Sequence, residues 1–131
     1  AHPKATLPFQ AYPFNAGADF SCLSEVTIPQ HSSTLIDSGL IFEIPNQYYI
    51  QLQPRSSLYK SNILLLGGFI DPTYRGTVKF TLYNLNSFPV TFKAHSRLVQ
   101  GIILPNILTR YTLTQEPLTQ TSRGTAGFGS S

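Results

Sequence analysis

The central part of the chain reads Thr77-Val78-Lys79-Phe80-Thr81-Leu82-Tyr83, in which apolar and polar side chains partly alternate. Successive side chains of a β-strand point to opposite faces, so this pattern predicts a strand with one buried face. Four further runs of branched or aromatic residues, bounded by turn residues, lie at 40–44, 48–53, 88–92 and 98–104. Such spacing predicts an all-β antiparallel barrel or sandwich, with one helical turn near residues 56–60.

Composition predicts one folded domain with part of its surface hidden. The chain has 131 residues, of which 41% are hydrophobic and only 11% are charged. Soluble domains usually contain about 25% charged residues, so this deficit favours an oligomer. The net charge of +3 suits an anionic small ligand, and the lysines and arginines do not cluster as in a nucleic-acid-binding surface. No apolar run is long enough to span a membrane, so we expect neither a nucleic-acid nor a membrane partner.

The cysteine and histidine residues show no pattern typical of a metal site or a disulfide. Cys22 is the only cysteine, which excludes an intrachain disulfide and a cysteine-rich zinc site. The three histidines, His2, His31 and His95, are far apart in the sequence and lack ligand spacing, so we expect them on the surface.

Three segments combine polar side chains with turn residues. Residues 15–21 form either a loop before the first strand or a site in which Asp19 orders Mg²⁺. In residues 54–58, adjacent hydroxyls precede a helical turn, which predicts either a serine N-cap or an anion site. Residues 67–76 contain an acidic, an aromatic and a basic residue. They form either a plain turn or a hairpin whose backbone N–H and C=O groups bind the edge of a flat ring.

Two more segments lie near the C-terminus. Residues 97–100 predict Arg97 and Val99 on one strand face and Gln100 on the other, where its amide needs a phosphate or a backbone partner. Residues 105–122 lose any apolar pattern and read as an extended arm. In residues 123–131 glycines surround Arg123, which suits a phosphate, and Phe128, which suits a nucleobase. The alternative interpretation of this segment is a disordered terminus.

In chain order, these five segments resemble the five motifs of the trimeric dUTPase family. The matches are Ala-Gly-Ala-Asp at 16–19, Pro-Arg-Ser-Ser-Leu at 54–58, Gly-Phe-Ile-Asp-Pro-Thr-Tyr-Arg-Gly at 68–76, Arg-Leu-Val-Gln at 97–100 and Arg-Gly-Thr-Ala-Gly-Phe-Gly-Ser-Ser at 123–131. The third is the most specific, and the five together cover nearly the whole chain.

The resemblance implies a distorted jelly-roll β-barrel of the dUTPase-like β-clip type. It implies a single domain over residues 1–131, with an N-terminal extension at 1–14, an extended arm at 105–122 and a flexible glycine-rich active-site tail at 123–131. It also implies a homotrimer with exchanged C-terminal arms. Each of its three sites would take motif three from one subunit, motifs one, two and four from a second, and the tail from a third.

The implied reaction is hydrolysis of dUTP to dUMP and pyrophosphate, by Mg²⁺-assisted attack of water on the α-phosphate. Asp71 matches the general base, and Asp19 would hold Mg²⁺ through water. Tyr74 would pack under the sugar and exclude a 2′-hydroxyl, and Phe128 would close over the uracil. The substrate-binding residues implied in this way are Arg55, Ser56, Ser57, Gly68, Ile70, Tyr74, Lys79, Gln100, Arg123, Phe128, Gly129 and Ser130.

Two alternatives stay open, and the chain departs from the family pattern at two positions. A dCTP deaminase, a relative on the same fold, shares Arg-Ser-Ser-Leu and Ile-Asp-Pro, but its glutamate falls where this chain has Thr81. The second alternative is a catalytically inactive scaffold derived from a dUTPase. Ser57 replaces a common glycine and Gly101 a usual leucine. The short link between motifs two and three resembles retroviral members, so we expect a viral source. We expect an intracellular protein, and the choice between cytoplasm and nucleus stays open.

Overall fold

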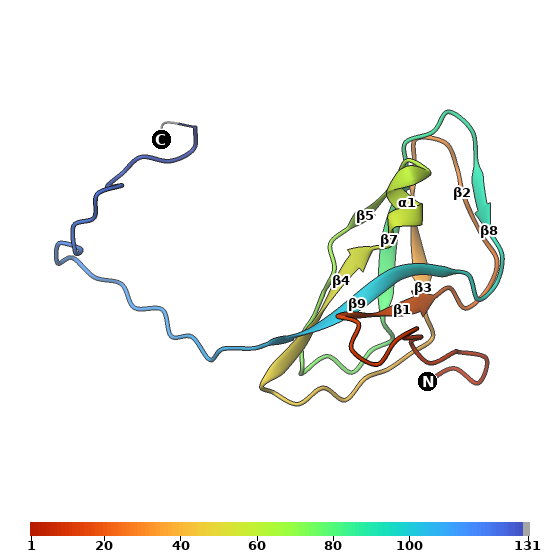
Figure 1. Cartoon of the computed structure of the whole chain (residues 1–131), viewed down its shortest axis with the longest axis horizontal. Helices are drawn as coiled ribbons and strands as arrows, with labels where there is room; N and C mark the ends of the chain where they lie inside the picture. Colours follow the sequence, from red (N-terminus) through yellow and green to blue (C-terminus); the bar gives the residue numbers. More distant parts are fainter. Residues whose placement is uncertain (130–131) are drawn as a thin grey trace.

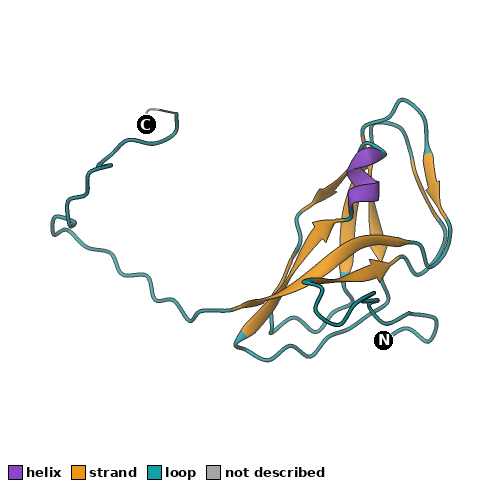
Figure 2. Ribbon diagram, in the orientation of Figure 1, coloured by secondary structure: helices purple, strands orange, loops and turns teal. Residues whose placement is uncertain are grey.

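The computed structural model describes residues 1–129, within which nine strands and one short helix form (Figures 1 and 2). In chain order they are β1 Gly17–Ser21, β2 Val26–Ile28, β3 Ser33–Asp37, β4 Tyr48–Pro54, α1 Ser56–Lys60, β5 Ile63–Leu66, β6 Phe69–Ile70, β7 Lys79–Asn84, β8 Val90–Phe92 and β9 Arg97–Pro105. Every strand pair in this part of the chain is antiparallel. The all-β prediction and the single helical turn are therefore confirmed.

The strands form three sheets with the orders β1-β9-β4-β6, β2-β8 and β3-β7-β5. Strand β9 lies between β1 and β4, although about 40 residues or more separate it from either in the sequence. This pairing places Gln100 opposite both Asp19 and Gln53. Three segments that the sequence separates widely therefore meet at one place on this sheet.

The core follows the predicted alternation of side chains. Along β7, Phe80 and Leu82 are buried while Lys79 is exposed. The buried apolar cluster takes further members from β1, β4 and β9, among them Phe20, Leu52 and Val99. Each such side chain contributes about 1.5–3 kcal/mol by leaving water. This core fixes the strands that carry the polar segments.

The run at residues 40–44 was predicted as a strand and is not one. Gly39 has φ of +71°, a conformation that favours glycine, and breaks the chain direction after β3. Leu40 and Ile44 are buried, but the segment joins no sheet. Its apolar side chains therefore fill the core from an extended connection, which periodicity alone does not distinguish from a strand.

The turn that holds Asp71 does not close a paired hairpin, contrary to one of the two interpretations of the sequence. Strand β6 pairs with β4 in the four-stranded sheet, whereas β7 pairs with β3 and β5. Residues 71–78 therefore cross from one sheet to another. The turn is closed locally by the backbone N–H of Tyr74, which donates to the carbonyl of Asp71 at 3.1 Å.

The two ends of the chain differ in how they contact the strands. Near the N-terminus, His2 donates its N–H to the Gly39 carbonyl at 2.8 Å, and Phe9 forms a bridge with Asp19. After β9, residues 106–129 form neither helix nor strand and run away from the sheets (Figure 1). No helix within the described residues is long and apolar enough to cross a membrane.

Candidate active site

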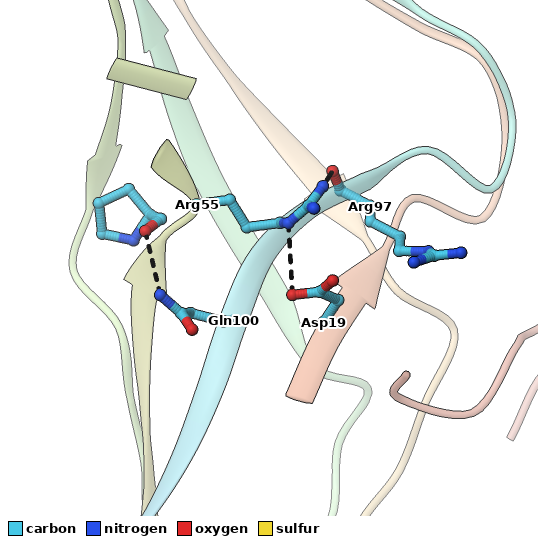
Figure 3. A network of polar contacts seen from close by, with 5 residues as sticks. Asp19, Arg55, Arg97 and Gln100 are labelled. Atoms are coloured by element: carbon cyan, nitrogen blue, oxygen red, sulfur yellow. Dashed lines mark hydrogen bonds and ion pairs between the residues drawn. The ribbon is translucent and has the colours of Figure 1, made fainter. Parts of the chain in front are cut away.

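Asp19, Arg55 and Gln100 form a polar cluster, called here the Arg55 cluster, where β1, β9 and the end of β4 meet (Figure 3). The Nε of Arg55 lies 3.3 Å from an oxygen of the Asp19 carboxylate. A second guanidinium nitrogen, Nη1, donates to the backbone carbonyl of Arg97 at 2.9 Å. Two contacts thus fix the guanidinium, and an arginine has further N–H groups for a bound anion.

Gln100 has only a weak partner in this cluster. Its Nε2 donates to the carbonyl of Pro54 at 3.5 Å, which is long for a hydrogen bond. Its Oε1 occupies the space beside Gly17, where an added Cβ would lie 2.6 Å from that oxygen. The sequence offered a phosphate oxygen or a backbone carbonyl as the partner of this amide, and the structure shows the backbone carbonyl. The weakness of that contact leaves the amide able to exchange it for a ligand oxygen.

The prediction that Arg97 and Val99 share a strand face is wrong. Between Phe20 and Ser21 the pairing with β9 shifts by one residue, because Leu98 is an extra residue opposite β1. Such a bulge re-aims the side chains on either side of it. Arg97 is exposed while Val99 is buried, and the Arg97 guanidinium lies 3.8 Å from the centre of the Phe9 ring.

The two serines of the second motif lie at the start of α1 and are exposed. The residue at the N-cap is Arg55, whose side chain makes no capping hydrogen bond, so the predicted serine cap is wrong. Ser56 and Ser57 therefore follow directly after the arginine that the Asp19 carboxylate holds. The chain itself thus places both residues next to Arg55.

Asp71 opens onto a separate hollow, called here the Asp71 pocket, of about 200 Å³. The carboxylate is exposed, and the next residue, Pro72, is buried and stiffens the turn. Residues from β6, the turn and β7 line the pocket, namely Phe69, Ile70, Asp71, Tyr74, Val78 and Lys79. Of the predicted site residues, it thus gathers Ile70, Asp71, Tyr74 and Lys79.

Two glycines shape this region. The Tyr74 hydroxyl donates to the Thr77 carbonyl at 2.8 Å, so the ring folds back over Gly76, where an added Cβ would lie 2.6 Å from Cζ. Gly68 has φ of +134°, and its carbonyl accepts from the Leu52 N–H at 2.7 Å. An added Cβ there would lie 3.1 Å from the Leu52 carbonyl oxygen, so the close approach of the chain to β4 also favours glycine.

The tail residues form a small turn of their own. Arg123 donates from Nε to the carbonyl of Ala126 at 2.7 Å, and the Phe128 ring is fully exposed. Gly129 has φ of +91°, whereas Ser130 lies outside the described residues. Within residues 1–129, no residue of the tail or of the Arg55 cluster lines the Asp71 pocket. Within one chain the predicted site residues that the structure describes therefore fall into three separate groups.

The Arg55 cluster offers one carboxylate for a metal. Within residues 1–129 no group of three or more His, Cys, Asp or Glu side chains lies close enough to hold an ion. A metal at Asp19 would therefore take most of its ligands from water and from a bound substrate. Mg²⁺ prefers this arrangement in phosphate-binding sites, so the cluster fits the predicted ion.

Sequence reasoning missed two aromatic residues near these groups. Phe69 lines the Asp71 pocket, and its place within the third motif could have indicated this. Phe9 contacts Arg97 and pairs with Asp19, but no motif or spacing in the sequence marks it. Only the fold brings the N-terminal segment beside β1.

Comparison with known proteins identifies the family of this chain. The chain is 35% identical to a deoxyuridine 5′-triphosphate nucleotidohydrolase of Picosynechococcus, over 98% of this chain and 92% of the relative. It is 36% identical to one of Paramecium bursaria Chlorella virus 1, over 97% and 90%. A solved dUTPase of Staphylococcus bacteriophage 80alpha with dUPNHPP superposes with a TM-score of 0.90 at 20% identity, over 98% and 93%. That likeness confirms the jelly-roll fold. The family model for dUTPase matches residues 3–131, and the chain therefore belongs to the dUTPase family.

Proposed function

We propose that this protein hydrolyses dUTP to dUMP and pyrophosphate. The two relatives compared above are deoxyuridine 5′-triphosphate nucleotidohydrolases, which supports the substrate. The observation that carries the proposal is the Asp71 pocket, because it places an exposed carboxylate beside an aromatic ring and main chain suited to a nucleoside. A binding scaffold requires no carboxylate at this place, and a deaminase would need its glutamate where this chain has Thr81.

Asp71 acts as the general base. Its carboxylate orients a water molecule and takes a proton from it as the water oxygen bonds to the α-phosphorus. The bond from that phosphorus to the bridging oxygen breaks, and pyrophosphate leaves. A positioned base of this kind accelerates a reaction by about 10²–10⁴-fold. The exposure of Asp71 leaves room for the water.

Selectivity for deoxyuridine comes from the walls of the Asp71 pocket. The main chain around Gly68, Ile70 and Lys79 reads the uracil edge, and polar groups left unpaired by another base penalise its binding. The Tyr74 ring, held by its hydroxyl on the Thr77 carbonyl, packs under the sugar and leaves no space for a 2′-hydroxyl. A tied ring discriminates better than a mobile one because its position is set before binding.

The Arg55 cluster binds the triphosphate. Arg55, Ser56, Ser57 and Gln100 donate to phosphate oxygens, and Asp19 would hold Mg²⁺ through water. The ion would supply neutralisation of the charge on the triphosphate. The exposed hydroxyls and the long Gln100 contact support these roles, since neither is engaged in a strong hydrogen bond.

The complete site requires three copies of the chain. The three groups of site residues lie apart in one copy, and the segment at 105–122 runs away from the sheets (Figure 1). Apolar side chains along that segment, Ile107, Leu108, Tyr111 and Leu113, are 79–101% exposed, as expected of an arm that packs on a neighbour. In the homotrimer the arm carries the tail to another subunit, where Arg123 clamps the γ-phosphate and Phe128, with Gly129 and Ser130, closes over the nucleotide.

The direct test incubates the purified protein with each dNTP and Mg²⁺ and measures pyrophosphate and ammonia. Release of pyrophosphate from dUTP alone supports the proposal, whereas release of ammonia from dCTP supports a deaminase. Release of neither product supports an inactive scaffold. Asp71→Asn should lose at least about 10²-fold in kcat and still bind dUTP. Loss of binding together with turnover would mean that Asp71 is not the base.

A further inference from the structure

Four residues form a closed circuit of contacts around the Arg55 guanidinium. The Asp19 carboxylate contacts Arg55 Nε, Arg55 Nη1 donates to the Arg97 carbonyl, and the Arg97 guanidinium lies over the Phe9 ring. The circuit closes because Phe9 and Asp19 exchange two backbone hydrogen bonds, of 2.9 and 2.7 Å. Each member therefore restrains the next.

The position of the Phe9 ring follows from the backbone. The bridge to Asp19 attaches the N-terminal segment to the outer edge of β1, and the hydrogen bond from His2 to Gly39 attaches it a second time. The ring is 44% exposed, so it adds little to the core. Its main contact with a charged group is the Arg97 guanidinium, 3.8 Å from the ring centre. An aromatic face attracts a cation at this distance.

Arg97 lies on the strand that pairs with β1, which carries Asp19. It pairs with Ser21, two residues beyond Asp19 on the same strand. Figure 3 shows its side chain directed away from Arg55, on the other side of β1. Without an attractive surface there, the Arg97 guanidinium could compete with Arg55 for the single carboxylate. An arginine that bound Asp19 in place of Arg55 would leave Arg55 without its fixed orientation.

We propose that Phe9 is a positioning residue for phosphate binding. It holds Arg97 off the Asp19 carboxylate, so that Asp19 and the Arg97 carbonyl fix the Arg55 guanidinium before the triphosphate arrives. Phe9 itself touches no substrate. The proposal deepens the function proposed above and rests on it for the identity of the ligand.

The test compares two substitutions that both keep the backbone bridge and a large, mostly apolar side chain. Phe9→Leu removes the aromatic face, whereas Phe9→Tyr keeps it. We expect Phe9→Leu to raise KM for dUTP about 2- to 5-fold, which is what an exposed cation–π contact supports, with kcat unchanged. Phe9→Tyr should keep the original KM. Equal KM values in the two variants and the parent protein would overturn the proposal.

A second measurement separates this proposal from the proposed function. The Arg55 Nε–H resonance, assigned by its loss in Arg55→Lys, reports whether the guanidinium is held without any nucleotide. We expect it sharp in the parent protein and in Phe9→Tyr, and broadened in Phe9→Leu. If dUTP is not hydrolysed at all, the proposed function fails, and this resonance alone decides about Phe9. In an Arg97→Gln background, Phe9→Leu should have no further effect, and an undiminished effect there would contradict the role of Arg97.

Discussion

The Nε of Arg55 lies 3.3 Å from the carboxylate of Asp19, so the residue proposed to bind phosphate and the residue proposed to hold Mg²⁺ neutralise each other. Their side chains are 35% and 20% exposed, which leaves both accessible to a ligand. A triphosphate with its Mg²⁺ brings the opposite charges to the same place. It can therefore bind to the remaining N–H groups of Arg55 and to the Asp19 carboxylate while the ion pair stays formed.

Asp19→Asn tests this relationship. The amide keeps the size of the side chain but removes the charge that attracts the ion. Losing an outer-shell ligand typically costs about 10- to 100-fold in metal affinity, so half-maximal activity should require that much more Mg²⁺. The measurement is a Mg²⁺ titration of pyrophosphate release. Glu25→Gln, which changes an exposed carboxylate in the loop after β1, serves as the matched control and should leave the titration unchanged.

Tyr74 should control discrimination between dUTP and UTP. Tyr74→Ala removes the ring and opens space for a 2′-hydroxyl, so the ratio of kcat/KM for UTP to that for dUTP should rise about 10- to 100-fold. Tyr74→Phe loses the hydrogen bond to Thr77 but keeps the ring, so its ratio should rise less than that of the alanine variant. If the alanine variant rejected UTP as before, the ring would not be the barrier.

Gly101, where leucine is usual in the family, should be a packing adaptation. A Cβ added there would lie 2.6 Å from the Phe20 ring and 3.1 Å from Ile50, and both residues are buried. Gly101→Ala should therefore lower the free energy of unfolding by about 1–3 kcal/mol. Phe20→Leu in the same chain should restore part of this loss. Denaturant unfolding of the two variants measures both effects, and additive losses would contradict the account.

The tail should matter for turnover and not for stability. The hydrogen bonds of Arg123 and Gly124 stay within residues 121–126, and Phe128 is fully exposed. A chain ending at Ser122 should keep the melting temperature of the parent protein. Its kcat/KM for dUTP should fall about 10²-fold or more, as when one charge-stabilising group is lost. Arg123→Lys is a less drastic change, because it keeps the charge but not the planar guanidinium. Its kcat/KM for dUTP should lie between those of the parent protein and the truncated chain.

Sequence periodicity found the long strands and β8, and it missed the other short strands. Strands β4 and β9 stand out because buried apolar residues recur along seven and nine positions. Strand β1, by contrast, reads Gly-Ala-Asp-Phe-Ser, a composition poor in strand-forming residues, and pairing with β9 holds it in place. Residues 63–66 are continuously apolar, and their length was too short to distinguish a strand from other buried chain.

The candidate site shows a similar division. Asp71, Tyr74 and Lys79 could be grouped from the sequence because one short segment carries them to one pocket. The ion pair between Asp19 and Arg55 could not, since it depends on two strands meeting through β9. The bulge at Leu98, which turns Arg97 toward Phe9, has no signal in the local pattern.

The central claim is that each site combines residues of different copies of this chain. The most direct measurement co-expresses Asp71→Asn with Arg55→Gln, two variants that are each inactive, and purifies the mixed trimers. If motif two and motif three of a site come from different copies, random mixing gives about one quarter of sites with neither substitution, and that share of dUTP hydrolysis should return. If both motifs came from one copy, every site would carry a substitution, and the mixture would stay as inactive as its parents.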